Sequence, residues 1–99
     1  MEVEFSSNRL AQCYRQSDRA VRQWGEAVAR KYITRIEILY AQPTFDSLRT
    51  LRSLRLHPLK GRRQGQYAID LTGQWRLIVT PGAKEEQVRV EEVTNHYDD

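Results

Sequence analysis

The 99-residue sequence contains one cysteine and no long run of apolar residues. A single cysteine cannot form a disulfide within the chain, so we expect Cys13 to be a small core residue in a reducing compartment. The first ten residues include two acids and no continuous apolar segment, which excludes a secretory signal and a membrane span there. These absences predict a cytoplasmic protein with no membrane association.

The sequence also lacks the motifs of several enzyme classes. One cysteine and two widely separated histidines cannot supply a structural zinc site. The glycine-containing segment KGRRQG, residues 60–65, has neither the Walker spacing nor a helix after it. There is no GxSxG elbow and no pair of carboxylates at a useful spacing. We therefore expect no metal and no small-molecule cofactor, and an enzyme of this sequence would use imidazole and cationic side chains.

Charged residues are abundant, and the two signs are segregated along the chain. Residues 49–63 contain six cations and no acid, whereas residues 84–99 contain six acids and two cations. Such a basic patch favours polyanionic partners, although an ordinary solvated surface would carry the same charges. The 39% hydrophobic content is typical of a globular chain, and the length predicts one domain over residues 1–99.

The first half of the sequence predicts a short strand and two helices. The strand is VEF (Val3–Phe5), and the SSN that follows it suits a helix N-cap. Apolar residues recur at helical spacing over residues 7–15 and again from about residue 17 to 41. Gly25 lies inside the second helix at a cost of about 1 kcal/mol relative to alanine. Residues 45–54 predict a further short helical turn.

The second half predicts a loop and three strands. Pro58 and two glycines mark residues 57–65 as loop, with His57 restricted to extended geometry. QYAIDL and QWRLIV flank a turn at Thr72–Gly73 and form a hairpin, and QVRVEEV forms a last strand. The expected fold is α+β: an N-terminal strand and two helices packed on one face of a mostly antiparallel sheet, in the order β-α-α-β-β-β.

The helices can cover only one face of this sheet, so Arg76 is expected on the other face or its rim. A bulge at Glu91–Glu92 would return Val93 to the core side and point His96 the same way as Arg76. Without the bulge, Tyr97 takes the place of His96. Both arrangements stay open at this point. Trp24 and Trp75 lie within apolar stripes and are expected to be core residues.

The residue types near the expected open face suit metal-free cleavage of RNA. That reaction needs a base for the ribose 2′-hydroxyl, cations for the phosphate charge and an acid for the departing 5′-oxygen. His57 can serve in either proton transfer, while Lys60 and Arg76 can stabilise the phosphate. Each residue also has an ordinary structural explanation. His57 could be hydrogen-bonded to the backbone, and Lys60 could be a solvated surface residue. Arg76 could be the cross-strand partner of an acid such as Glu91.

The run LHPLKGRRQGQYAIDLTGQWRLIV, residues 56–79, resembles the L-H-P-L-K-G…G-x-[WY]-x-[IV]…Q-[WY]-R-[IL] pattern of RelE/ParE superfamily toxins. The similarity is greatest to the HigB-like branch, the plasmid-maintenance killer proteins. This resemblance implies a RelE-like fold and the toxin half of a type II toxin–antitoxin pair. HigB- and RelE-like members cleave messenger RNA in the ribosomal A site, whereas ParE-like members poison DNA gyrase and cleave no RNA.

The resemblance also implies roles for individual residues. The loop histidine and lysine of the family correspond to His57 and Lys60, and the arginine after the strand aromatic corresponds to Arg76. HigB-like relatives end in an acid–Tyr–His triplet, whereas this chain ends in NHYDD, with His96 and Tyr97 in the reverse order. Asp70 stands where many relatives carry an arginine, which removes one phosphate contact.

The leading hypothesis is a metal-independent, ribosome-dependent mRNA endonuclease. His57 would transfer a proton, Lys60 and Arg76 would stabilise the transition state, and His96 or Tyr97 would act as the second acid or base, or stack on a base. A basic cluster would dock the protein on ribosomal RNA in a salt-sensitive manner; its members are Arg49, Arg52, Arg55, Arg62 and Arg63. The implied partners are an antitoxin encoded nearby, the ribosome and mRNA.

Three alternatives lead to different experiments. A ParE-like gyrase inhibitor would have no catalytic residues and would be indifferent to His57. A catalytically weakened toxin fold acting as a binding module would accommodate Asp70 and the NHYDD ending. The remaining alternative is an unrelated RNA-binding domain.

Overall fold

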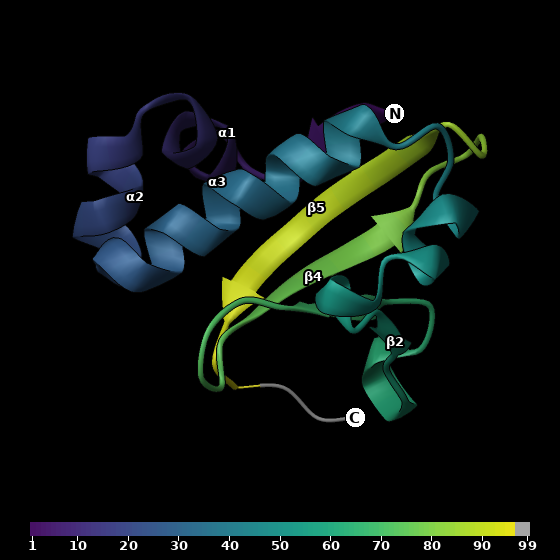
Figure 1. Ribbon diagram of the computed structural model, residues 1–99. Coiled ribbons are helices and arrows are strands. Elements are labelled where there is room, and N and C mark those ends of the chain that lie inside the picture. The colour runs from purple at the N-terminus through teal and green to yellow at the C-terminus, as the bar shows by residue number, and fades with distance from the viewer. Residues whose placement is uncertain (97–99) are drawn as a thin grey trace.

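Three α-helices cover one face of a five-stranded sheet in the computed structural model, which describes residues 1–96 (Figure 1). The helices are α1 (Asn8–Arg15), α2 (Ser17–Trp24) and α3 (Glu26–Ala41). The strands are β1 (Glu2–Phe5), β2 (His57–Pro58), β3 (Tyr67–Asp70), β4 (Arg76–Pro81) and β5 (Gln87–Thr94). Three short 3-10 helices complete the described elements: η1 (Asp46–Thr50), η2 (Arg52–Leu54) and η3 (Gly61–Arg63). The α+β class is confirmed.

The strand order is β1-β5-β4-β3-β2. β1 runs parallel to β5, and the other neighbours are antiparallel, so the sheet is mixed but mostly antiparallel, as expected. The strand β2 lies in a segment that the sequence predicted as loop. It forms because Pro58 keeps the preceding His57 extended, which lets His57 pair with Ala68 of β3. No helix within residues 1–96 is both long and apolar enough to cross a membrane.

The prediction of a single helix over residues 17–41 is wrong, because α2 ends before Gly25 and α3 begins after it. This glycine has φ 85° and ψ 166°, a conformation that residues with a side chain rarely adopt. Its backbone still serves both helices: its N–H donates to Val21 at 2.8 Å, and its carbonyl accepts from Ala29 at 3.0 Å. The break lets α2 fold back on α3, where Trp24 packs against Tyr32 with ring centroids 4.7 Å apart.

Replacing Gly25 with alanine is therefore expected to lower the free energy of unfolding by about 1–3 kcal/mol, the usual range for such backbone strain. Space is not the reason, because no atom lies within 4 Å of the added Cβ. Urea unfolding measures the change, with Gln23→Ala on the exposed surface of α2 as the control. A more stable variant would instead show that α2 and α3 can join as one helix.

The main core lies between the helices and the sheet. The two tryptophans, Trp24 and Trp75, both pack against it, as expected. Cys13 is 2% exposed, and its burial raises the pKa of its thiol, which is the environment of a structural cysteine. The hairpin residues expected to face inward are all in or against this core: Tyr67, Ile69, Leu71, Trp75, Leu77 and Val79.

A second, small apolar cluster lies on the opposite face of the sheet. Leu59 is 3% exposed and packs with Ala68 and Ile78, so the segment 57–66 folds back over part of this face. The expected bulge in β5 is also present. Ile78 pairs with Glu92 and Val79 with Val90, which skips Glu91; the shift returns Val93 to the core side. We call the sheet face away from the helices the open face.

Candidate functional site

The open face carries the residues that the sequence singled out. Paired residues in a sheet point to the same side, so the strand register arranges them in rows. Two neighbouring rows of cross-strand partners can be traced: His57–Ala68–Ile78–Glu92 and Asp70–Arg76–Thr94. The open-face position expected for Arg76 is confirmed. His57 lies on the same face because β2 pairs with β3.

The imidazole of His57 is oriented by the backbone. Its Nδ1 lies 2.9 Å from the carbonyl oxygen of Arg55. A carbonyl can only accept a hydrogen bond, so this contact places a proton on Nδ1, and the neutral ring then has its lone pair on Nε2. Arg55 provides the carbonyl from a left-handed conformation with φ 51°, at the turn between η2 and β2. The Arg55 carbonyl thus favours the tautomer of the neutral ring that carries its proton on Nδ1.

The carboxylate of Asp70 connects two arginines. Oδ2 lies 3.1 Å from Nε of Arg55, and Oδ1 lies 2.9 Å from Nε of Arg76. Arg76 is fixed further by the carbonyls of Gly73 and Trp75, which accept from its Nη1 at 2.9 Å each. Asp70 is thus the cross-strand acid opposite Arg76. Arg55, expected in the ribosome-docking cluster, lies in the same network as Arg76.

The acid suggested by the sequence for this role, Glu91, has other partners. It is the bulge residue, and its Oε2 accepts from the hydroxyl of Thr80 at 2.7 Å. It also lies 3.4 Å from Nε of Arg89. The bulge explains the difference, because it shifts Glu91 out of register with β4.

A buried arginine that is absent from the predicted site supports this network from the helical side. Arg35 of α3 is 8% exposed; its Nε donates to the carbonyl of Asp70 at 3.0 Å and its Nη2 to the carbonyl of Ser53 at 3.1 Å. It therefore ties the end of β3 to η2, directly before Arg55. A charged residue among apolar helix positions is an unusual pattern, and that pattern was the available signal.

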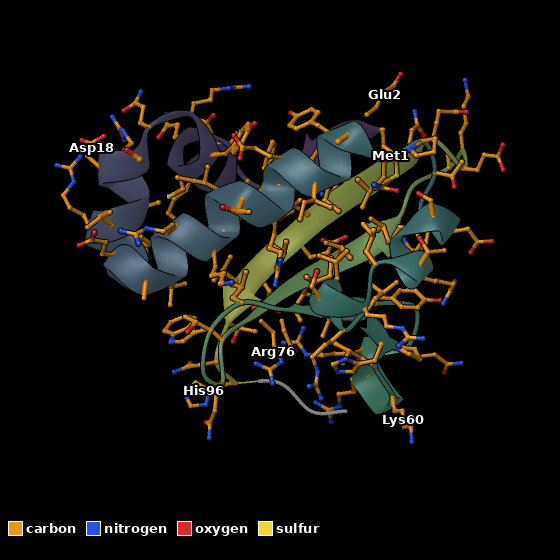
Figure 2. All side chains as sticks on the ribbon, in the orientation of Figure 1. Met1, Glu2, Asp18, Lys60, Arg76 and His96 are labelled. Carbon is orange, nitrogen blue, oxygen red and sulfur yellow. The ribbon has the colours of Figure 1, made fainter. Side chains whose placement is uncertain are left out.

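The loop cations have different surroundings. Lys60 and Arg62 are exposed, whereas Arg63 is half-buried. Nη1 of Arg63 lies 2.6 Å from Oε1 of Glu92 and 3.0 Å from Oε1 of Gln66. Arg63 thus holds the segment 57–66 against β5. Figure 2 shows Lys60 at the lower edge of the molecule, with Arg76 between it and His96 in this view.

The remaining arginines of the expected docking cluster precede this loop. Arg49 forms an ion pair with Asp46 at 2.9 Å and lies over the ring of Tyr67, 5.4 Å from its centroid. The hydrogen bond to Asp46 raises the pKa of Arg49. Arg52 is exposed on η2. Within residues 1–96, three of the five cluster members have acidic partners: Arg49, Arg55 and Arg63.

The C-terminal candidates lie at the end of the described chain. His96 is exposed and follows β5; its N–H donates to the hydroxyl of Thr94 at 3.0 Å, and that hydroxyl donates to its carbonyl at 2.9 Å. Tyr97 lies outside the described residues. Within residues 1–96, no three His, Cys, Asp or Glu side chains are grouped so as to hold a metal ion.

Comparisons with known proteins agree with this architecture. The YoeB/ParE toxin from Agrobacterium tumefaciens has a TM-score of 0.62 at 16% identity, and the match covers 98% of this chain and 100% of that chain. The YoeB-YefM complex from Staphylococcus aureus has a TM-score of 0.60 at 14% identity, with 98% of each chain covered. At such identities the likeness shows the shared fold. Comparison with curated proteins gave no match.

A family model covers almost the whole chain. Residues 3–97 match the model described as RelE-like toxin of type II toxin-antitoxin system HigB. The match extends well beyond residues 56–79, on which the resemblance in the sequence rested, and includes the helices, the hairpin and the last strand. The chain therefore belongs to the HigB-like family of RelE-like type II toxins.

Proposed function

We propose that this toxin is a metal-independent endoribonuclease that cleaves messenger RNA on the ribosome. The observation that carries the proposal is the orientation of His57. The Arg55 carbonyl fixes its Nδ1, and it shares the open face with Arg76. An oriented imidazole and a guanidinium on the same face of the sheet are the groups needed to transfer a proton and to stabilise a phosphate.

In the proposed reaction, Nε2 of His57 takes the proton from a ribose 2′-hydroxyl as the 2′-oxygen attacks the adjacent phosphorus. A bond forms between the 2′-oxygen and phosphorus, and the bond from phosphorus to the 5′-oxygen breaks. Arg76 and Lys60 stabilise the charge on the phosphate oxygens, and a second group, His96 or Tyr97, protonates the leaving 5′-oxygen. The products are a 2′,3′-cyclic phosphate and a 5′-hydroxyl end.

Binding to the ribosome would use the exposed basic side chains of Arg49, Arg52 and Arg62. They lie on η1, η2 and η3, in the segments that precede and follow the proposed catalytic residue His57. Phosphate contacts of this kind give affinity without sequence preference and weaken steeply with salt. The ribosome would then present the message, which suits a site on a sheet surface.

The partner proposed for the toxin is an antitoxin protein. The family is defined by toxin–antitoxin systems, and one structure of the same fold is named as the YoeB-YefM complex. An antitoxin that covers the open face would block His57 and Arg76 together. Co-expression of a neighbouring open reading frame and co-purification test this partner.

Inducible expression of the wild-type chain in bacteria, with primer extension on an abundant message, tests the function. We expect growth arrest with cuts that follow the reading frame and disappear when translation is blocked. Arrest with DNA-damage signalling and intact messages would indicate a gyrase inhibitor. Absence of arrest would indicate a toxin fold that acts as a binding module.

A further inference from the structure

Asp70 is an acid in the middle of a site proposed to bind an anion. Each of its carboxylate oxygens faces the guanidinium of a different arginine, at 3.1 Å for Arg55 and 2.9 Å for Arg76. A phosphate also has two unbridged oxygens, each of which can form an ion pair with one arginine. The carboxylate therefore has the charge and the contacts that an RNA phosphate would have at this place.

Partial burial strengthens the interaction between the Asp70 carboxylate and Arg76. The side chains of Asp70 and Arg76 are 23% and 19% exposed, whereas that of Arg55 is 76% exposed. Charges that are largely withdrawn from water interact more strongly than exposed ones. The three groups carry a formal charge of +1 together, and removal of the carboxylate would leave +2.

The backbone of Asp70 is held in place, so its carboxylate cannot leave the site easily. Arg35 donates to its carbonyl at 3.0 Å from the helical side, and its strand pairs with β4. Arg55 is the mobile partner, because its exposed side chain has a flexible stem. A phosphate that arrives at the open face would therefore have to compete with Asp70 for Arg55.

We propose that Asp70 acts as an internal competitor for the RNA phosphate and sets the affinity of this site, with Arg55 as the exchanged ligand. The proposal rests on the proposed function, because it assumes that RNA binds at the open face. It moves Arg55 from the docking surface to the substrate site. The toxin would consequently bind RNA weakly on its own and depend on the ribosome to present the message.

The test measures binding and not cleavage. The probe is a fluorescent RNA oligonucleotide with 2′-deoxy substitutions, which cannot be cleaved by 2′-hydroxyl attack, and fluorescence anisotropy gives its Kd at several salt concentrations. We expect Asp70→Asn to tighten binding about tenfold at low salt and to steepen the salt dependence by roughly one phosphate contact. Thermal unfolding checks that each variant is folded, and Asp70→Ser serves if the asparagine variant is not.

The chain offers a matched control in Asp18→Asn. Asp18 pairs with Arg22 at 3.2 Å on the exposed surface of α2, so the variant makes the same change in net charge away from the basic cluster. We expect less than a twofold effect from it. In the Asp70→Asn background, Arg55→Ala should remove the gain in affinity.

Two results would overturn the proposal. Equal tightening by both asparagine variants would show a general charge effect, and unchanged or weaker binding by Asp70→Asn would show that Asp70 organises the arginines for RNA. Either result is independent of whether the wild-type chain cuts messages in cells. Messages that stay intact in cells would overturn the proposed nuclease without deciding the role of Asp70.

Discussion

Replacing His57 with alanine is expected to lower the rate of message cleavage by about 10²–10⁴-fold, the usual contribution of a general acid or base. The reason is the loss of Nε2, the atom that is set up to accept a proton when Nδ1 donates to the Arg55 carbonyl at 2.9 Å. Cleavage of a reporter message by the purified variant in a translation extract measures the effect. The fold should persist, because His57 is only half-buried and lies in a two-residue strand.

A second substitution separates proton transfer from positioning. His57→Asn keeps a side-chain N–H that can donate to the Arg55 carbonyl, but it has no nitrogen that accepts a proton at neutral pH. Both variants should be inactive if His57 transfers the proton. Substantial activity in His57→Asn would restrict His57 to holding the turn at Arg55, and undiminished activity in both variants would contradict the proposed mechanism.

The largest effect on stability is expected from Arg35→Met. The methionine fills similar space, but the carbonyls of Asp70 and Ser53 lose donors at 3.0 and 3.1 Å. A lost hydrogen bond from a charged donor costs about 1.5–3 kcal/mol, so we expect the free energy of unfolding to fall by roughly 2–4 kcal/mol in all. Urea denaturation followed by circular dichroism measures it.

Arg30→Met is the matched control on the same helix. Arg30 forms an exposed ion pair with Glu26 at 2.8 Å, with both side chains 75% exposed, and such pairs contribute about 0.3–0.5 kcal/mol. If Arg35→Met were no more destabilising than this control, Arg35 would not be the tie between β3 and η2. A folded Arg35→Met variant should also cleave poorly, because η2 would lose the anchor that precedes Arg55, whose carbonyl orients His57.

The sheet was largely predictable because its periodicity is strong. The alternation in residues 66–79 identified the hairpin and its inward residues, and the pair Glu91–Glu92 before Val93 indicated the bulge. The break at Gly25 was not predictable from propensity. A glycine inside a helix costs only about 1 kcal/mol, so propensity does not decide between a continuous and a broken helix. The packing of α2 on α3, which includes the contact between Trp24 and Tyr32, is not revealed by the sequence.

The open-face position of Arg76 followed from strand alternation, but that of His57 depends on the unexpected strand β2, and the contacts of the site were not predicted. The pairing of Asp70 with Arg55 depends on the left-handed turn at Arg55, and nothing in local sequence requires a non-glycine residue to adopt it. Arg35 reaches the site across the core from α3, which is far from β3 in the sequence. Contacts of this kind depend on tertiary packing and are invisible to periodicity.

The proposed cleavage of messenger RNA on the ribosome by 2′-hydroxyl attack can be recognised by the chemistry of the new RNA ends. Purified toxin would be added to a reconstituted translation mixture with a defined message, and the 3′ fragment would be treated with polynucleotide kinase and labelled ATP without prior phosphatase. We expect immediate labelling, which marks a 5′-hydroxyl end, and no cutting when ribosomes are omitted. A message that stays intact, or fragments that accept label only after phosphatase treatment, would rule out this reaction.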